Sequence, residues 1–448
     1  MKVLKSFFIV ALTGTALMLS ATDWYVRLDG GKNKNAGTTP SAPLKNLWKA
    51  IEKAAPGDTI HVAEGNYPGK MACGWILVDK PLKIYGGYAP DFSTRDILKY
   101  RTMLRPTNAQ NDTKPSMDGG TISIVTGDTQ PKRQKFGSTA QVVIDGMIFD
   151  HTDANNYHGI NGKPAGFKDG MLTIPPARGT KPKPSIDRYM LYAKTDGTLV
   201  ISNCLFLNSC NYAININHFS GKVIITNNVI INSRMMGANV RSSNGKLFMV
   251  EYEFANNTVL FTWTRTKEFN DNDMGFGVRD NTGVVSNIHH NIIGLNCMSG
   301  FDNAMGDPKK KKTRLDKNVF FLNKKADVSL AIGGAKIKFM KIGDPGFEDM
   351  EDAPGIESLD GNVALTDPKA FKGVIDESFL QAFLNATYTE KTDYDPNSPA
   401  NVFRSAFGLN QQGTITSKVT MFANPYPFES AVKFFGAVPG FGAQVPAK

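Results

Sequence analysis

Four consecutive lines of sequence between Gly197 and Met305 decide the fold. They read GTLVISNCLFLNSCNYAININHFSG (197–221), KVIITNNVIINSRMMGANVRSSNG (222–245), KLFMVEYEFANNTVLFTWTRTKEFNDNDMGFGVRDNTG (246–283) and VVSNIHHNIIGLNCMSGFDNAM (284–305). Each line has a β-branched run, a corner that contains asparagine or histidine, a second apolar run, a polar turn and a short alternating segment. Because no helical period separates the short strands, the pattern predicts an all-β solenoid rather than a helical repeat.

Aligned in this way, the four lines share two columns of residues at one corner. The first column is Asn203, Asn227, Asn256 and His290, and the second is Cys204, Asn228, Asn257 and Asn291. The spacings within a column are 24, 29 and 34 residues, which is the range of solenoid repeats. Stacked asparagines can hydrogen-bond along such a column and satisfy the turn backbone. We therefore expect these columns, together with His289, to be scaffold.

The residues before the repeat contain a strand, a turn-rich loop, a helix and a second strand, in that order. The quoted elements are WYVRLDGG, NAGT and SAPLKNLWKAIEKAAPGDTIHVAEGNY, within residues 24–67. This order resembles the N-terminal signature of secreted right-handed parallel β-helix proteins of the pectate-lyase-like superfamily. The resemblance extends over roughly residues 22–350 and implies a right-handed parallel β-helix with a short N-terminal capping helix. It does not choose an activity, because that superfamily includes lyases, hydrolases, epimerases and non-catalytic surface proteins.

Three segments follow from these patterns. Residues 1–21 are predicted to be a signal peptide, residues 22–350 the β-helix, and residues 351–448 an irregular C-terminal cap or extension. Within the β-helix we expect a cap at 22–58, a long insertion at 151–188 and an enlarged coil loop at 262–274. A long insertion on a solenoid coil often forms the wall of a binding groove, although it can also be an excursion without a role.

The N-terminal residues and the net charge predict a cellular compartment and a class of binding partner. Lys2 and Lys5 precede an apolar run that ends in small residues, which predicts export to the periplasm or the exterior. No later stretch is long and apolar enough to predict a transmembrane segment. The formal charge of +10 favours an acidic polysaccharide or another glycan as partner, although excess lysine can also serve solubility alone. Nucleic acid is not expected as a partner, and the sequence leaves open the oligomeric state and the pairing of its four cysteines.

The strongest functional signal is a polar column on the outward side of the alternating segments. Aligning these segments by their closing glycines (Gly197, Gly221, Gly245 and Gly283) places apolar residues inward and gives one outward column. That column reads Lys194, Asn217, Arg241 and Arg279, with Asn239 and His218 beside it. Stacked cations repel each other, and a bound polyanion would resolve the repulsion through bidentate arginine contacts. The alternative is that Asp280, Asp302 or the long insertion already neutralises the arginines.

Two further groups of residues are expected beside this column. The enlarged loop brings Trp263, Arg265 and Lys267 to the same face, where an aromatic ring and cations suit a sugar. Oxygen ligands for calcium could come from four carboxylates: Asp271, Asp273, Asp280 and Asp302. Glu251 and Glu253 also share an outward strand face, and they could instead pair with nearby lysines.

The resulting hypothesis is a polysaccharide lyase that cleaves a uronic-acid glycan by β-elimination. Related β-helix lyases imply that Arg241, Arg279 or Lys194 removes the C5 proton while the other cations, with or without calcium, neutralise the carboxylate. Two alternatives stay open: a non-catalytic surface β-helix that binds glycan, and a glycoside hydrolase that uses paired carboxylates such as Asp280 and Asp302.

Overall fold

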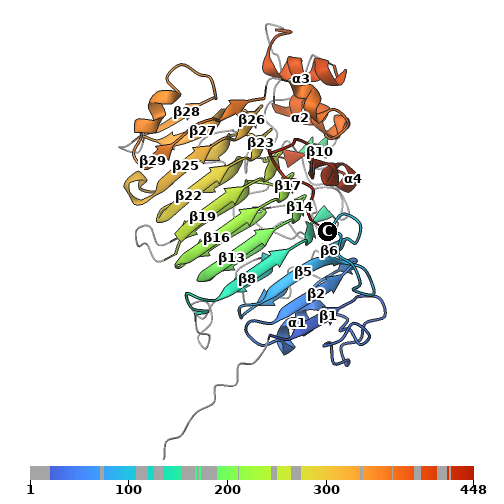
Figure 1. Ribbon diagram of the computed structural model, residues 1–448. Helices are drawn as coiled ribbons and strands as arrows, with labels where there is room; N and C mark the ends of the chain where they lie inside the picture. The colour runs from blue at the N-terminus through green and yellow to red at the C-terminus, as the bar shows by residue number, and fades with distance from the viewer. Residues whose placement is uncertain are drawn as a thin grey trace, which may run out of the picture.

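The protein is a right-handed parallel β-helix, seen in Figure 1 as short strands stacked one above another along the length of the molecule. The computed structural model describes residues 21–70, 75–106, 120–125, 135–152, 167–168, 171–172, 189–209, 211–243, 250–263, 274–332, 336–365, 367–387, 395–410, 421–422 and 425–447. The predicted signal peptide therefore lies outside the described residues, apart from Ala21. The all-β solenoid expected from the repeat is confirmed.

Three long sheets form the sides of the solenoid. Sheet 1 contains β1 (Asp23–Val26), β2 (Thr59–Ala63), β5 (Lys83–Tyr88), β8 (Gln141–Asp145), β13 (Gly197–Ser202), β16 (Gly221–Thr226), β19 (Val250–Ala255), β22 (Val284–His289), β25 (Lys312–Asp316) and β29 (Ile356–Ser358). Sheet 2 contains β4 (Ile76–Val78), β7 (Gly120–Val125), β12 (Tyr189–Lys194), β15 (Ile214–His218), β18 (Met236–Ser242), β21 (Phe276–Asp280), β24 (Ser299–Asp302), β27 (Ala326–Ala331) and β28 (Ile337–Met340). Sheet 3 contains β3 (Gly65–Tyr67), β6 (Thr102–Leu104), β9 (Ile148–Asp150), β14 (Leu205–Leu207), β17 (Val229–Ile231), β20 (Thr258–Leu260), β23 (Ile292–Gly294), β26 (Val319–Phe321) and β30 (Val363–Ala364).

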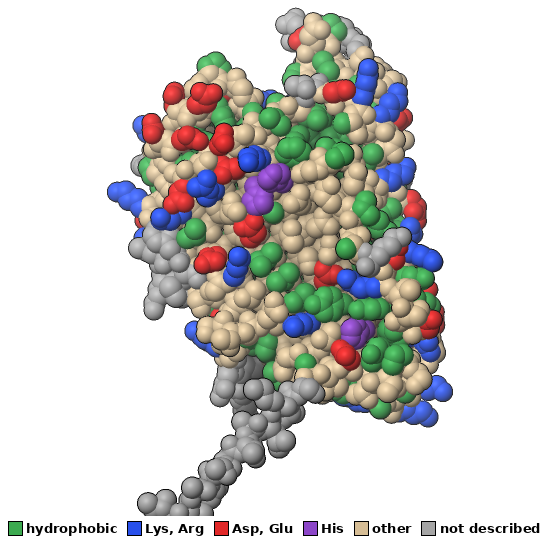
Figure 2. Space-filling model, in the orientation of Figure 1, with side chains coloured by type: hydrophobic (Ala, Val, Ile, Leu, Met, Phe, Trp, Pro, Cys, Tyr) green, Lys and Arg blue, Asp and Glu red, His purple; other side chains and the backbone are tan. Residues whose placement is uncertain are grey.

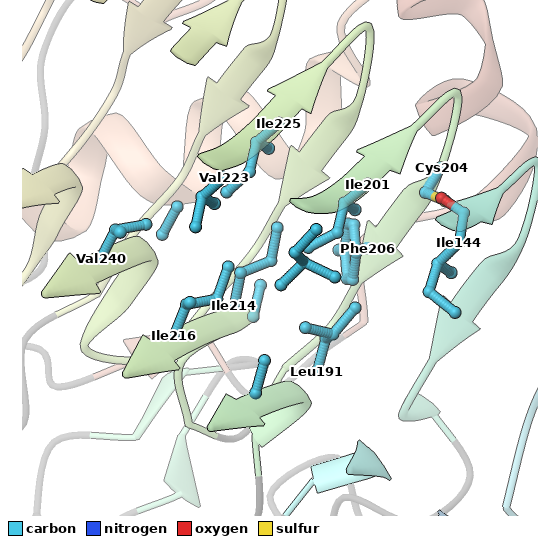
Figure 3. Close-up of a cluster of buried hydrophobic side chains, with 14 of the residues drawn as sticks. Ile144, Leu191, Ile201, Cys204, Phe206, Ile214, Ile216, Val223, Ile225 and Val240 are labelled. Atoms are coloured by element: carbon cyan, nitrogen blue, oxygen red, sulfur yellow. The ribbon is translucent and has the colours of Figure 1, made fainter. Parts of the chain in front are cut away.

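The interior of the coils is apolar. Alternate residues of each strand point inward, so equivalent positions of successive coils stack into rows such as Leu191, Ile214 and Ala238. All three residues are fully buried, and Figure 3 shows part of this packing. Cys204 and Cys297 are buried, in keeping with cysteines that fill space in the coil.

The asparagine columns form the corner between sheets 1 and 3. Asn203, Asn227, Asn256 and His290 all adopt left-handed backbone conformations, with φ between 53° and 58°. In the neighbouring column, Asn257 accepts from the backbone N–H of Asn228 at 2.9 Å and donates to Asn291 at 3.2 Å. Asparagine tolerates the left-handed conformation better than most residues, and its amide satisfies the turn. The expectation that these columns are scaffold is confirmed.

The two ends of the solenoid differ. At the N-terminal end, α1 (Leu47–Lys53) buries Leu47, Ala50 and Ile51 against the first coil. At the other end the coils continue past residue 350, since β29 pairs with β25 and β30 pairs with β26. The short 3-10 helix η5 (Glu348–Asp352) buries Met350 in the last coil.

The rest of the C-terminal segment packs on the outer side of sheet 3. It contains η6 (Pro368–Phe371), α2 (Glu377–Thr387), α3 (Pro399–Phe407), α4 (Phe428–Ala431) and η7 (Val432–Phe434). Phe379, Phe403 and Tyr426 join one buried cluster with Leu260 and Phe321 of the sheet. β31 (Met421–Phe422) also pairs with β11 (Met171–Leu172), which pairs with β10 (Phe167–Lys168), so the insertion and the extension share a small sheet. In the described part of the chain, no helix is long and apolar enough to cross a membrane.

Candidate functional site

The outward column of sheet 2 differs from the one expected. Arg279 lies opposite Asn239 and not in the row of Arg241, whose neighbour on the preceding strand is Asn217. The row that contains Arg279 runs Tyr192, Asn215, Asn239, Arg279, Asp302 and Ser329. The predicted column with Arg241 and Arg279 as direct neighbours is therefore wrong, because Arg279 is displaced by two residues along its strand. The predicted repulsion between two directly stacked arginines is absent from this row.

Arg279 is neutralised within the protein. Its Nε donates to Oδ2 of Asp302, and the two residues are 5% and 1% exposed. Ser329 Oγ and the backbone N–H of Ala304 donate to the other oxygen of Asp302 at 2.7 and 3.1 Å. The alternative that a carboxylate already balances the arginine is thus the observed one, and neither residue has the access that a catalytic base or a calcium ligand needs.

Asp280 points into the coil, on the side of sheet 2 opposite to Asp302. It is fully buried, accepting from Thr313 Oγ1 at 2.6 Å and from Asn303 Nδ2 at 3.0 Å, with Lys311 Nζ at 3.8 Å. Burial raises the pKa of Asp280 and lowers the pKa of Lys311. The expected pairing of Asp280 and Asp302 at a metal or as hydrolase carboxylates is therefore wrong, because the two face opposite sides of the sheet.

Two of the expected substrate contacts are interior residues. Trp263 is fully buried, donates from Nε1 to Asn232 Oδ1 at 2.8 Å and packs at 4.8 Å from the ring of Phe383. His218 is fully buried and donates from Nε2 to the backbone oxygen of Gly197 at 2.9 Å. Neither can contact a glycan on the surface. Arg265, Lys267, Asp271 and Asp273 lie outside the described residues.

Four of the predicted site residues remain together on sheet 2. Arg241 is exposed, and its Nε donates to Asn217 Oδ1. Asn217 in turn donates to the hydroxyl of Tyr192 at 3.3 Å, and Asn239 donates to Asn215 at 2.9 Å. Lys194 is half-buried, with Nζ 5.6 Å from the centre of the Phe219 ring. This hydrogen-bonded row holds the guanidinium of Arg241 at the surface.

Tyr189 and Tyr212 lie beside this row and are not among the site residues predicted from the sequence. The half-buried rings of Tyr189 and Tyr212 lie 5.3 Å apart, and Tyr189 stacks on Tyr192 at 5.8 Å. Burial, followed by the neighbouring phenol of Tyr212, raises the pKa of Tyr189. The repeated tyrosine in RYMLYAK and NYAININ is the signal that could have found them. An aromatic cluster beside a surface arginine suits a sugar ring and a carboxylate.

A second polar group lies on the outer side of sheet 1, on the face of the molecule that Figure 2 shows. Glu253 contacts His289 Nε2 at 2.6 Å and accepts from Asn287 at 3.0 Å, and His289 contacts His290 at 2.8 Å. Burial raises the pKa of Glu253, but the hydrogen bonds from His289 and Asn287 outweigh it and the net direction is downward. The predicted alternative for Glu253 was pairing with a lysine, and the observed partner is His289 instead. In the described residues, no group of three or more His, Cys, Asp or Glu side chains is arranged to hold a metal ion.

Comparison with known proteins supports the fold and assigns no activity. Residues 29–90 match a family described as a protein of unknown function, DUF1565, which is a parallel β-helix family. This match covers most of the segment on which the resemblance to β-helix proteins rests. No curated protein matches the chain.

Proposed function

We propose that this β-helix protein binds an acidic glycan across the outer side of sheet 2, at the cluster of Tyr189, Tyr212, Asn217 and Arg241. One observation carries the proposal: an exposed arginine is fixed by a row of side-chain hydrogen bonds next to half-buried tyrosines. Aromatic rings offer an apolar face to a sugar, and a guanidinium matches a carboxylate or sulfate in bidentate fashion. Because the row is already ordered, little side-chain entropy is lost on binding.

Binding without cleavage is the form of the proposal that the described residues favour. Arg279 is not a suitable catalytic base for a lyase, because Asp302 neutralises it. Asp280 and Asp302 are not suitable paired carboxylates for a hydrolase, because both are buried. Arg241 and Lys194 remain as candidate bases, but a guanidinium is a hydrogen-bond donor without an acceptor position, which suits binding better than proton abstraction. The positive charge of the chain supports an acidic ligand, and export through residues 1–21 would bring the protein to such glycans.

The test is affinity electrophoresis and calorimetry of the purified chain with pectate, alginate and sulfated glycosaminoglycan, with dextran as the uncharged control. Arg241→Ala should weaken binding of the preferred acidic glycan by about tenfold, the worth of one charge-assisted contact. Arg314→Ala is the matched control, because Arg314 is a similarly exposed arginine on sheet 1. Retained affinity in Arg241→Ala, or equal binding of dextran, would overturn the proposal.

The same incubations separate binding from catalysis. An absorbance from unsaturated uronate would restore the lyase hypothesis, and new reducing ends without that absorbance would indicate hydrolysis. Parallel samples with calcium and with a chelator test whether the protein uses calcium. The positions of Asp280 and Asp302 do not support a calcium site, and Asp271 and Asp273 lie outside the described residues.

A further inference from the structure

A small cleft lies between α1 and β4 at the N-terminal end of the stack, where Figure 1 shows α1. We call it the N-terminal cleft. Its volume is about 190 Å³. Sites for drug-sized ligands typically measure about 300–1,000 Å³, so this cleft has room for a molecule of about one ring. The residues that give it its chemistry are two tryptophans, two carboxylates and two lysines: Trp48, Trp75, Glu52, Asp79, Lys70 and Lys80.

The two indole rings border the same space. Lys70 Nζ lies 5.4 Å from the centre of the Trp48 ring and 5.8 Å from the centre of the Trp75 ring. Trp48 belongs to α1 and Trp75 directly precedes β4, and both elements are anchored in the core, through Ile51 and Ile76 respectively. Both rings are half-buried, so each keeps some apolar surface for a ligand. The apolar face of a sugar ring packs well on such a surface.

The indole N–H of Trp75 is a buried donor without a partner in the described residues. Trp24, at the same end of the molecule, differs in this respect, because its Nε1 donates to Asp58 Oδ2 at 2.8 Å. A buried indole N–H usually has an acceptor, since an unmade hydrogen bond is unfavourable. A hydroxyl of a molecule in the cleft would supply the acceptor that Trp75 lacks.

The charges that line the cleft balance. Lys70 Nζ lies 3.7 Å from Glu52 Oε1, and Lys80 Nζ lies 3.8 Å from Asp79 Oδ1. Two carboxylates and two ammonium groups give no net charge, so the cleft has no general attraction for an ion. They still offer acceptors and donors, which an uncharged molecule with many hydroxyls can use.

We propose that the N-terminal cleft binds one uncharged sugar ring, either a free monosaccharide or the terminal residue of a glycan chain. The ring packs against an indole, and one of its hydroxyls accepts from Trp75 Nε1. The cleft shares no residue with the cluster of Tyr189, Tyr212, Asn217 and Arg241, so this proposal does not depend on the binding of an acidic glycan there. Dextran remains a valid control for that cluster, because a dextran chain has few terminal rings for its mass.

Tryptophan fluorescence and calorimetry of the full chain test the proposal. The probes are glucose, galactose, mannose and xylose, each beside its trisaccharide: cellotriose, β-1,4-galactotriose, mannotriose and xylotriose. Two of the four tryptophans line the cleft, so a bound ring should change the emission. Binding of a trisaccharide supports a chain end as the ligand, and binding of a free sugar alone supports a monosaccharide. The proposal is overturned if none of the eight probes binds with a dissociation constant of about 1 mM or tighter.

Three variants locate the ring in the cleft. Trp75→Phe keeps an aromatic ring but removes the donor, so affinity for the bound probe should fall by about fivefold. Trp48→Ala removes an indole face and should weaken binding by about tenfold. Trp24→Phe is the matched control, because it removes an indole N–H that is already paired outside the cleft, and affinity should not change. Each variant is measured below its own thermal transition. Unchanged affinity in either cleft variant, or an equal loss in Trp24→Phe, would overturn the proposal.

Discussion

Arg279 and Asp302 face each other on neighbouring strands of sheet 2 and form a buried ion pair. The guanidinium also lies 4.5 Å from the ring of Phe276, and Ser329 and Ala304 complete the hydrogen bonding of the carboxylate. Both groups are almost completely shielded from solvent, so each depends on the other for its charge to be tolerated. The pair therefore belongs to the stability of the coil stack rather than to a surface site.

Replacing one partner of this pair should be costly. Arg279→Met leaves the Asp302 carboxylate buried without a counter-charge, which typically costs about 3–5 kcal/mol. Arg241→Ala, at the exposed arginine of the neighbouring row, should cost only about 1 kcal/mol, because it removes one neutral-acceptor hydrogen bond, to Asn217. Urea denaturation measures both. The double variant Arg279→Met/Asp302→Leu should recover much of the loss, and equal stability of Arg279→Met and the unmodified chain would contradict the buried-pair interpretation.

Asn257 should be equally intolerant of substitution. Its side chain accepts from Asn228 N and Nδ2, both at 2.9 Å, and donates to the backbone oxygen of Ile225 at 2.9 Å. Asn257→Ala removes these three hydrogen bonds and leaves the buried backbone N–H of Asn228 without its acceptor, so it should lower the free energy of unfolding by at least about 2 kcal/mol in urea denaturation.

The neighbouring column provides the control. Asn256 is in the left-handed conformation with φ 53°, and its side-chain amide makes a long contact of 3.5 Å to the backbone oxygen of Gly440. Asn256→Gly keeps that backbone conformation at no steric cost and should be close to neutral. A loss in Asn256→Gly as large as that in Asn257→Ala would contradict the assignment of the hydrogen-bond ladder to the second column.

The sequence was sufficient to predict the solenoid and the asparagine corners, but not the lateral register of the site. Gly197 and Gly221 do pair, yet the partner of Gly221 in the next coil is Val250 rather than Gly245, because the turns differ in length. A register error of two residues leaves the same side chains pointing inward. The apolar pattern that supports the register is therefore unchanged by the error and cannot reveal it. It moved Arg279 into the wrong row, beside Arg241 instead of Asn239.

The position of Trp263 could not be predicted for a different reason. Its burial depends on Phe383 and the rest of the C-terminal segment, more than 100 residues later in the chain, which packs on sheet 3. The sequence of the enlarged loop by itself shows a tryptophan among charged residues and does not indicate these distant contacts. The inward orientation of Asp280 is similarly hidden, because its partner Lys311 comes from a lysine run that reads as a solvated turn.

Trp263→Ala should therefore destabilise the protein without affecting a ligand on sheet 2. Removing a fully buried indole typically costs about 3–5 kcal/mol, here by opening a cavity against Phe383 and leaving Asn232 without its donor. Thermal unfolding measures the loss, and glycan affinity below the transition should equal that of the unmodified chain. Trp48→Ala, at a half-buried ring of the N-terminal cleft, should cost less. Weakened glycan binding in a folded Trp263→Ala protein would contradict the buried role.

His218 should make the protein less stable in mild acid. Burial lowers the pKa of His218 below its usual 6.5, while the bond to Gly197 and the charge of Asp196 oppose that shift only in part. The neutral ring donates from Nε2, and its Nδ1 is buried without a partner, so a proton added there would lack an acceptor. As the pH falls below about 6.5 the unfolded chain takes up this proton first, so the free energy of unfolding decreases until the pH passes the folded pKa. His218→Gln should shrink the difference in melting temperature between pH 7.5 and pH 5, whereas an unchanged difference would assign the acid sensitivity to other groups.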